Sequence, residues 1–486
     1  MSLCMDSAMN KPIHNVGRVS PQGVTRQEPA EVRNVDVGLR CANPTYGAEW
    51  RTFSIDEIKA GRPASIAIGP FGSRMKSDCY VSTGVHVVRG TNLSSGREFS
   101  GEFVFVTAEK AKELGGANLQ PDDLVFPHRG SIGEVGIVPD DTKQYVLSSS
   151  LMKLQCDTGK AIPLFMYYFF KSSIGRGELL KNTSQVGTPG IGQPLSSLKS
   201  IRLRLPSVEE QSRIANLLGA LDDRIALLRE TNVTLEAIAQ ALFKSWFVDF
   251  DPVRARQQGL APEGMDEATA ALFPDGFEES ELGLVPKDWR VGILSDFVVT
   301  SRKQLQPSDL HAELKYVGLE HIPRKSLGLT AWDTADGLES AKAAFSEGDI
   351  LFGKLRPYFH KVVVAPFDGV CSTDILVCRP RLPEHDALAA MLLSSVALID
   401  YADRLSNGAK MPRVTWKDLA AYRIVKPPQS VVAEYNLVVL PLLEKIRANV
   451  LSAQTLAALR DTLLPRLISG QLRLPEAASQ LEEATA

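Results

Sequence analysis

Two long stretches of the chain carry apolar residues at alternating steps of four and three positions. The first passes through Ile214, Leu218 and Ile225 and ends at Trp246, and the second runs from Tyr435 to its end with similar spacing. Since an α-helix completes a turn in 3.6 residues, this spacing places the apolar side chains on one face. The pattern predicts two helices of about 40 residues and about 60 Å each. Such a repeat over several heptads is typical of a coiled-coil seam.

Polar signals mark the ends and the interior of both predicted helices. Ser207 followed by Glu210 is a capping-box pattern, and Ser469-Gly470 is a natural helix end. Asparagine occurs once in each seam, where it could fix the register. The predicted seam consists of Leu221, Ile225, Leu228, Asn232, Leu235 and Leu242 in the first helix, and of Leu442, Ile446, Asn449, Leu456 and Leu463 in the second. The alternative is two ordinary amphipathic helices, each packed on its own domain.

An internal repeat relates the two halves of the chain. The stretch "DDLVFPHRGSIGEVGIVP" at 122–139 parallels "GDILFGKLRPYFHKVVVAP" at 348–366, and "LKSIRLRLP" parallels "LAAYRIVKP". An offset of 221 positions then aligns the helices, since it places Leu221 on Leu442 and Ile225 on Ile446. Each half is therefore expected to be a globular unit of roughly 150 residues followed by a long helix. We predict an α+β fold with two similar domains, joined by two long helices that pair as an antiparallel coiled coil with a pseudo-twofold axis.

The same comparison divides the chain. The expected segments are a flexible N-terminal extension (1–48), a first recognition domain (49–206), a central helix (207–250), a linker (251–287), a second recognition domain (288–428), a distal helix (429–470) and a C-terminal tail (471–486).

Composition excludes several classes of protein. With 486 residues, 44% hydrophobic and 23% charged, the chain has an ordinary globular composition. No run has the apolar length of a membrane helix, and the polar N-terminus does not resemble a signal peptide. Six cysteines without a C-x-x-C pair indicate reduced thiols in the cytoplasm and no zinc site. The net charge of −3 means that any nucleic-acid binding must depend on local patches.

One segment shares the outline of a nucleotide-binding loop, with four residues between Gly348 and Gly353-Lys354. A phosphate loop needs Ser or Thr after its lysine as a Mg²⁺ ligand, and this chain has Leu355 there. Pro357 also opposes the helix that should begin at that point. In the first repeat the equivalent segment has no such pattern. The stretch is therefore expected to be a strand and a basic turn, and no convincing catalytic constellation is found elsewhere.

Basic residues gather in matching segments of the two halves. Arg and Lys in such loops can bind phosphates or guanine edges, and an asparagine can pair with adenine. Because the major groove of DNA returns to one face every ~34–36 Å, two similar domains on a rigid spacer suit duplex DNA with two different half-sites. The predicted DNA-binding residues are Arg74, Lys76, Arg89, Asn92, Arg129, Lys181, Lys354, Arg356, Lys361, Lys410, Arg413 and Lys417. The alternative for many of them is a solvated surface charge.

Four segments resemble a known family. The block "LPSVEEQSRIANLLGALDDRIALLRETNVTLEAIAQALFKSWFVDFDPV" resembles the central conserved region of type I restriction–modification specificity subunits, and "LRDTLLPRLISGQL" at 459–472 resembles their distal conserved region. "GPFGSRMK" and "FGKLRPYFHKVVVAPFDGVCSTDILV" are similar to variants of their target-recognition domains. The resemblance covers about residues 49–475 and does not reach the first 48.

The resemblance implies a role without catalysis. Specificity subunits of this family bind a split DNA target with one recognition domain per half-site. They recruit two adenine-methylating modification subunits and, with them, ATP-driven restriction subunits. No cofactor is expected on this chain, since S-adenosylmethionine, ATP and Mg²⁺ belong to those partners.

Docking of partner subunits is expected on the outward helix faces and on Phe243, Trp246, Phe247 and Phe250. The alternative for these aromatic residues is packing against the adjacent domain or helix. The alternative function is a non-catalytic coiled-coil scaffold that joins two protein- or carbohydrate-binding domains.

Overall fold

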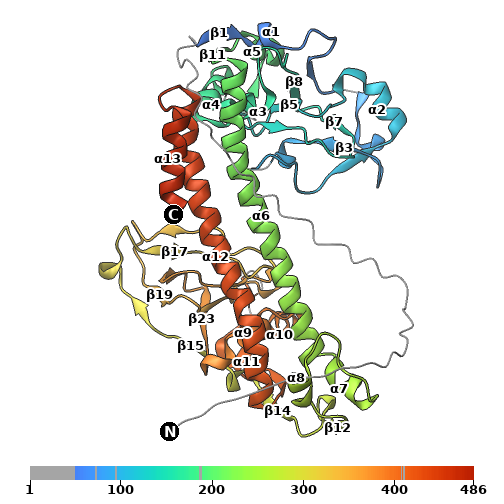
Figure 1. Cartoon of the computed structure of the whole chain (residues 1–486), viewed down its shortest axis with the longest axis vertical. Helices are drawn as coiled ribbons and strands as arrows, with labels where there is room; N and C mark the ends of the chain where they lie inside the picture. Colours follow the sequence, from blue (N-terminus) through green and yellow to red (C-terminus); the bar gives the residue numbers. More distant parts are fainter. Residues whose placement is uncertain are drawn as a thin grey trace, which may run out of the picture. The chain divides into compact units, whose positions relative to one another are not determined.

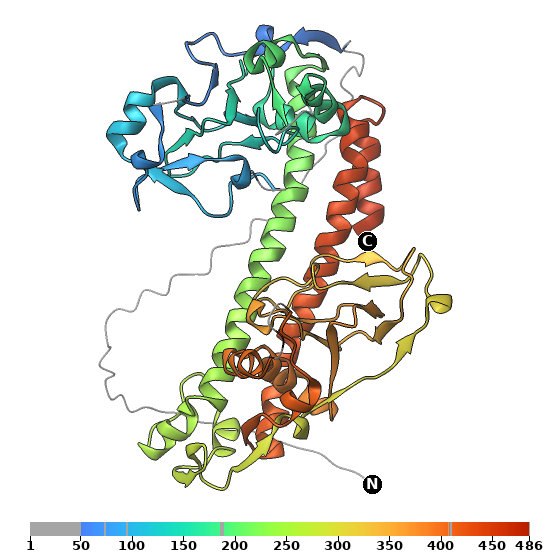
Figure 2. The same cartoon turned by 180° about the vertical axis from the view of Figure 1, so that it is seen from behind.

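Two helices of 40 residues each, α6 (Val208–Phe247) and α12 (Gln429–Ile468), lie side by side in the computed structural model (Figures 1 and 2). Along α6 from Asp222 to Ala239, the contacts on α12 pass from Arg460 to Tyr435, so the helices run in opposite directions. The predicted caps are confirmed: Ser207 accepts a hydrogen bond from the Glu210 amide at 3.2 Å, and Gly470 follows α12 with φ +75°.

The structure describes residues 50–71, 74–93, 96–184, 189–406, 408 and 411–485. The segment 1–48, predicted to be a flexible extension, lies outside them, and so does Lys410.

A pair of buried asparagines lies at the middle of the helix pair. Asn449 Nδ2 donates to Asn232 Oδ1 at 2.8 Å, and Asn232 Nδ2 donates to the Ile446 carbonyl at 3.2 Å. Apolar side chains such as Ile225 and Ala453 pack beside them. Of the other predicted seam positions, Leu221, Leu228 and Leu463 are buried, whereas Leu235, Leu242, Leu442 and Leu456 are partly buried.

The asparagine pair gives a stability prediction. Asn449→Ala should lower the free energy of unfolding by about 1–3 kcal/mol, because it leaves the buried Asn232 Oδ1 without a hydrogen-bond donor. The double replacement Asn232→Leu with Asn449→Leu should be neutral or stabilising, since no polar group then remains unsatisfied. Urea unfolding measures both, with Val233→Ala as the control because Val233 is 69% exposed. A double variant as unstable as the single variant would contradict this explanation.

The described part of the first domain contains two larger sheets and two small strand pairs. Strands β1 (Arg51–Ser54) and β11 (Arg202–Leu205) pair antiparallel beside α1 (Ile55–Ile58). The four-stranded sheet has the order β2 (Ile66–Ile68), β8 (Leu151–Leu154), β5 (Leu124–Pro127), β6 (Gly136–Ile137). The three-stranded sheet has the order β4 (Val104–Val106), β3 (Val85–Val88), β7 (Tyr145–Leu147). Its other elements are α2 (Ala108–Leu114), α3 (Pro163–Lys171), α4 (Ser173–Leu180), α5 (Pro194–Ser200) and the pair β9 (Thr183–Ser184) and β10 (Gly190–Ile191).

The second domain repeats this plan. Strands β14 (Arg290–Ile293) and β24 (Arg423–Lys426) pair antiparallel. The four-stranded sheet has the order β15 (Val298–Thr300), β23 (Ile375–Pro380), β20 (Ile350–Gly353), β21 (Val362–Val364). The second sheet has the order β16 (Gln304–Leu305), β19 (Lys342–Phe345), β22 (Gly369–Cys371), β17 (Lys315–Val317), β18 (Asp333–Thr334). Helices α9 (Asp386–Ser394), α10 (Val396–Leu405) and α11 (Trp416–Ala420) complete the domain, and the predicted α+β content is confirmed.

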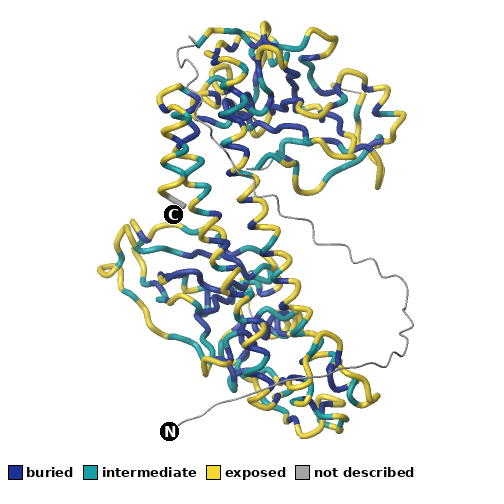
Figure 3. Tube along the Cα trace, in the orientation of Figure 1, coloured by how far each residue is buried: buried dark blue, intermediate teal, exposed yellow. Residues whose placement is uncertain are grey.

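Buried residues fill the interior of both domains (Figure 3), and every residue of the central strands β5 and β20 is buried. In β20, Ile350 and Phe352 join the core shared with the long helices, whereas Leu351 joins the core below the second sheet. In β5, Phe126 and Val125 divide in the same way. Since neighbouring strand residues point to opposite faces, the continuous apolar runs seen in the sequence supply both cores.

Side chains of the long helices join each helix to its domain. Gln211 of α6 accepts from the Ile162 amide at 2.9 Å before α3, and Asn436 of α12 accepts from the Ala387 amide at 2.9 Å in α9. At the first domain, Asp222 also accepts from Tyr168 Oη and from Arg460 Nη1, both at 2.6 Å. These contacts fix each domain to one end of the helix pair.

The segments expected to be linker and tail contain regular secondary structure. Residues 251–287 form α7 (Asp251–Gln257), α8 (Glu267–Ala271) and the hairpin β12 (Phe277–Ser280) and β13 (Gly283–Pro286). Val253 and Phe273 from this segment are almost fully buried in the second core. The tail forms α13 (Leu474–Thr485), which buries Ala477 against the first core. Few apolar residues per segment are enough here, because the neighbouring cores already exist.

A buried carboxylate on α6 contacts the second domain. Glu236 Oε1 accepts from Ser326 Oγ at 2.9 Å and from the Gly328 amide at 3.2 Å. Glu236 is 6% exposed. Burial raises the pKa of the Glu236 carboxyl above its usual value, and the donors from Ser326 to Gly328 offset part of that shift.

This raised pKa gives a pH prediction. A group whose pKa is higher in the folded state contributes stability at low pH and loses it as the pH rises through that pKa. We therefore expect Glu236→Gln to stabilise the protein at neutral pH and to make no difference below about pH 4, where the wild-type carboxyl is protonated. Unfolding measured from pH 4 to 8 tests this, with the exposed Glu230→Gln on the same helix as the control. A difference that is constant with pH would exclude the titration of Glu236 as its cause.

Candidate nucleic-acid interface

A basic pocket opens at one edge of the four-stranded sheet in the second domain. Its volume is about 350 Å³, and it is lined by the ends of β15, β20 and β23 together with α11. Arg302, Lys303 and Lys354 line it, and no acidic side chain is among its lining residues. Its lining also includes the aromatic side chain of Trp416 and the hydroxyl group of Thr373. Three cations without a carboxylate suit a phosphodiester, which needs positive charge and hydrogen-bond donors.

Lys354 is held at this pocket through its main chain. Its amide donates to the Asp374 carbonyl at 3.0 Å, and its carbonyl accepts from the Val414 amide at 3.1 Å. The neighbouring Asp374 carboxylate is engaged by Arg413, whose Nε and Nη2 donate at 2.8 and 3.2 Å. That hydrogen bond holds the pKa of Asp374 below its usual value. The Asp374 carboxylate is therefore already paired with Arg413, and the edge keeps an excess of positive charge.

The other predicted DNA-binding residues of the second domain differ in whether their side chains face solvent or the protein. Arg356 lies in the turn after β20, and Lys417 is exposed on α11. The prediction for Lys361 is corrected, because its Nζ donates to the Leu319 carbonyl. Burial and, to a smaller extent, the charge of Arg324 lower the pKa of Lys361. The Lys361 side chain therefore contacts the protein's own backbone.

In the first domain the structure brings part of the predicted set together. The ring of Phe71 lies 6.0 Å from that of His128, so the segment carrying the exposed Arg74 and Lys76 lies near the exposed Arg129. Lys181 is exposed and pairs with Glu178 of its own helix end.

Asn92 is a second correction. It is 0% exposed, and its Nδ2 donates to the carbonyls of Ser100 at 2.9 Å and Glu102 at 3.0 Å. Its Oδ1 accepts from the Arg89 amide at 3.0 Å, and Arg89 Nη2 donates to the Glu102 carbonyl at 2.8 Å. With all these groups in use, Asn92 has no amide edge to offer adenine. Asn92 and Arg89 therefore stabilise the loop that contains Ser100 and Glu102 through hydrogen bonds to its carbonyls.

The predicted docking aromatics are core residues, which corrects that expectation. Trp246 is 5% and Phe250 7% exposed, and both belong to the second core. Phe243 and Phe247 are partly buried against the same core. The residues of segment 251–287 and of α12 cover them, so the open alternative of packing against neighbouring elements is the one observed.

Exposed apolar side chains occur elsewhere on the long helices. They are Leu227, Val233 and Ile238 on α6 and Leu437, Val438 and Leu451 on α12. The sequence pattern did not single them out, because it records the buried stripe and treats the opposite face as polar. Arg302, Lys303 and Trp416 were also missed, since only the folded sheet brings their segments to one edge.

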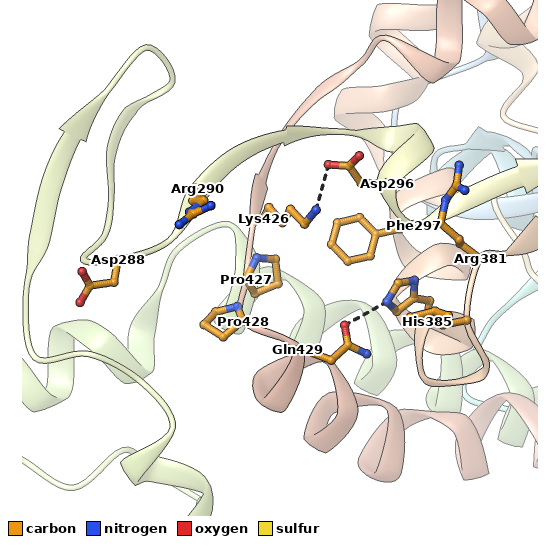
Figure 4. Close-up of a pocket in the computed structure, with 11 residues that line it drawn as sticks. Asp288, Arg290, Asp296, Phe297, Arg381, His385, Lys426, Pro427, Pro428 and Gln429 are labelled. Atoms are coloured by element: carbon orange, nitrogen blue, oxygen red, sulfur yellow. Dashed lines mark hydrogen bonds and ion pairs between the residues drawn. The ribbon is translucent and has the colours of Figure 1, made fainter.

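A second pocket, of about 440 Å³, lies where β14 and β24 meet the start of α12 (Figure 4). It also has cations, but Asp288 and Asp296 line it with them. Lys426 Nζ is already paired with Asp296 at 3.3 Å. This mixed charge makes it a poorer phosphate site than the pocket at Lys354.

Within the described residues, no group of three or more His, Cys, Asp or Glu side chains could hold a metal ion. Among those same residues, none of the helices is both long and apolar enough to cross a membrane.

Comparison with known proteins finds similarity to one class. Residues 68–237 match the Methylase_S family, the type I restriction modification DNA specificity domain. The chain is 28% identical over 324 residues to the type I restriction enzyme MjaIX specificity subunit of Methanocaldococcus jannaschii, covering 64% of this chain and 69% of that protein. It is 25% identical over 446 residues to the HindI specificity subunit of Haemophilus influenzae, covering 78% of this chain and 94% of that protein.

A solved structure shares the fold. The crystal structure of a type I restriction–modification system S subunit from M. genitalium matches with a TM-score of 0.54 and 16% identity, covering 87% of this chain and 96% of that chain. The resemblance that the sequence motifs carry is therefore confirmed: residues 68–237 match the type I DNA specificity domain, and the relatives named above are type I specificity subunits. Members of that class recognise DNA and are not catalysts, in agreement with the predicted non-enzymatic role.

Proposed function

We propose that this chain is the sequence-recognition subunit of a type I restriction–modification complex and binds an asymmetric bipartite DNA target, one domain to each half-site. The observation that carries the proposal is the duplicated domain plan on one pair of antiparallel helices. Duplex DNA is itself periodic, so two domains on a rigid spacer can read two half-sites at a fixed separation. The two copies differ in sequence, which favours two different half-sites.

The basic pocket supports a backbone contact in the second half-site. Arg302, Lys303 and Lys354 would neutralise phosphates, and such contacts position a protein without reading sequence. In the first domain, Arg74, Lys76 and Arg129 would serve the same purpose. Base recognition would fall to the loops between these contacts.

The partners in this proposal are two modification subunits and, through them, restriction subunits in the cytoplasm. S-adenosylmethionine, ATP and Mg²⁺ would be bound by those partners. The exposed apolar residues of α6 and α12 supply a docking surface in place of the buried aromatics. Single exposed apolar residues are common on protein surfaces, but these six lie along the two helices whose sequences resemble the conserved regions of specificity subunits.

Substitution on the helix surface tests the docking. Val233→Glu with Leu437→Glu should weaken capture of a modification subunit by roughly tenfold or more, because each adds a charge that must be desolvated in an apolar contact. Co-purification and calorimetry with the modification subunit measure it. Leu284→Glu is the matched control, since Leu284 is 63% exposed but lies in the β12–β13 hairpin. If Leu284→Glu weakens capture of the modification subunit as much as the double variant does, docking on this helix surface is contradicted.

The function is tested by co-expression with a modification subunit from the same cell, followed by single-molecule sequencing of host DNA for methylated adenine. We expect methylation confined to one split motif with a fixed spacer. If active modification subunits produce no motif, DNA recognition by this chain is contradicted. Binding that is insensitive to salt would then favour the scaffold that joins protein- or carbohydrate-binding domains.

A further inference from the structure

The turn between β20 and β21 presents an exposed tyrosine ring. Tyr358 is 51% exposed, whereas Pro357 before it is buried and Phe359 after it is half-buried. The rings of Tyr358 and Phe359 meet edge to face with centroids 4.6 Å apart. Among the described aromatic side chains, Phe71 is comparably exposed at 49% and Tyr80 less so at 37%. A large ring with this exposure is available for a partner.

The backbone of this turn adopts conformations that non-glycine residues avoid. Arg356 has φ 51° and ψ 67°, and His360 has φ 52° and ψ 57°, so both lie in the left-handed region. Such residues cost free energy and occur together at sites where a side chain must be held in one direction. Tyr358 is the middle residue of the segment that these two positions bound.

Several contacts keep the turn in this conformation. The Arg356 amide donates to the Pro412 carbonyl at 2.8 Å, and the His360 carbonyl accepts from the Lys325 amide at 2.9 Å. His360 Nε2 lies 2.8 Å from the Ser394 carbonyl at the end of α9. The turn is therefore anchored from three other segments, and the Tyr358 ring is presented by a rigid support.

Several cations lie around the turn, together with the carboxylates of Glu320 and Asp400. The Arg324 guanidinium lies 4.1 Å from the Phe359 ring, and Lys354 begins the turn at the basic pocket. The backbone of Arg413 forms an antiparallel β-bridge with Leu355, and its guanidinium pairs with the Asp374 carboxylate. A rigid aromatic ring among cations suits nucleic acid, because bases stack on the ring while the cations attract phosphates.

We propose that Tyr358 stacks on a base of the second DNA half-site and that this contact determines both affinity and local DNA conformation there. The inference rests on the proposed function and adds a specific residue and contact to it. The first domain has its own exposed ring, Phe71, beside the equivalent turn at His128. It comes from a different segment of the domain, which agrees with two different half-sites.

The test uses the full chain, with its modification subunits, and the duplex that the wild type enriches from a random library. 2-Aminopurine replaces each adenine of the enriched motif in turn. We expect the wild type to change the fluorescence at one position in one half of the motif. Tyr358→Ala should abolish that change and weaken binding at least tenfold, roughly the effect of losing one stacked base. Tyr358→Phe should retain both properties, and the salt dependence should not change, since no phosphate contact is lost.

Phe71→Ala is the matched control, because it removes an equally exposed ring from the other domain. It should leave the Tyr358-dependent fluorescence change in place. If the wild type enriches a split motif but Tyr358→Ala binds it with unchanged affinity and fluorescence, the stacking proposal is overturned and the proposed function stands. Enrichment of no motif by the wild type would overturn both.

Discussion

Trp246→Ala is expected to lower the free energy of unfolding by about 3–5 kcal/mol, the usual loss when a large aromatic side chain is removed from a core. The Trp246 ring lies 5.2 Å from Phe273 and 5.5 Å from Tyr435, both in edge-to-face arrangements. These residues come from the segment after α8 and from α12, so one side chain holds three separate parts of the chain together. Chemical denaturation followed by circular dichroism measures the loss.

The control for this prediction is Val248→Ala, because Val248 is 53% exposed just after the same helix. Surface substitutions of this kind normally change stability by less than about 0.5 kcal/mol. If Trp246→Ala kept its stability and lost only a partner subunit, the residue would be a docking residue as the sequence suggested, and its place in the core would be wrong.

The largest effect on DNA binding is expected from Arg302→Ala, Lys303→Ala and Lys354→Ala combined. Each phosphate contact contributes about 0.9 to the slope of log K against log salt concentration, so the slope should fall by about 2.7. At low salt the loss of affinity should be largest, because these charges act through released counterions. Binding titrations of the enriched duplex at several salt concentrations measure both quantities.

A second triple variant separates this pocket from general charge. Arg290→Ala, Arg381→Ala and Lys426→Ala remove the same formal charge from the mixed pocket of Figure 4, where Asp288 and Asp296 also lie. We expect a much smaller change in slope for it. Equal changes in the two variants would mean that net charge, and no particular pocket, controls binding.

The heptad pattern and the repeat carried much of the architecture because they depend on local periodicity. Burial of Leu221 and Ile446 follows from their spacing along the helices. The same pattern could not separate Trp246 from an exposed docking residue, since the elements that cover it come from 251–287 and α12. That segment has short elements without a sustained apolar period, so it gave no signal of an ordered core contribution.

The predicted site shows the same division. Polarity alone made Asn92 and Lys361 candidates for DNA contact, but hydrogen bonds to main-chain carbonyls hold both side chains against the protein. Conversely, Arg302 and Lys303 lie far from Lys354 in the chain, and only the pairing of β15 with β23 and of β23 with β20 places them at one pocket.

The sequence by itself determined the duplicated plan, the two long helices and the family resemblance, because each depends on residue order within one segment. The tertiary structure decided which polar side chains are available to a ligand and which aromatic residues are covered. Exposure depends on neighbours that are distant in sequence: Tyr358 stays exposed on an anchored turn, while Trp246 is enclosed by residues from three elements. Periodicity within one segment contains no information about those neighbours.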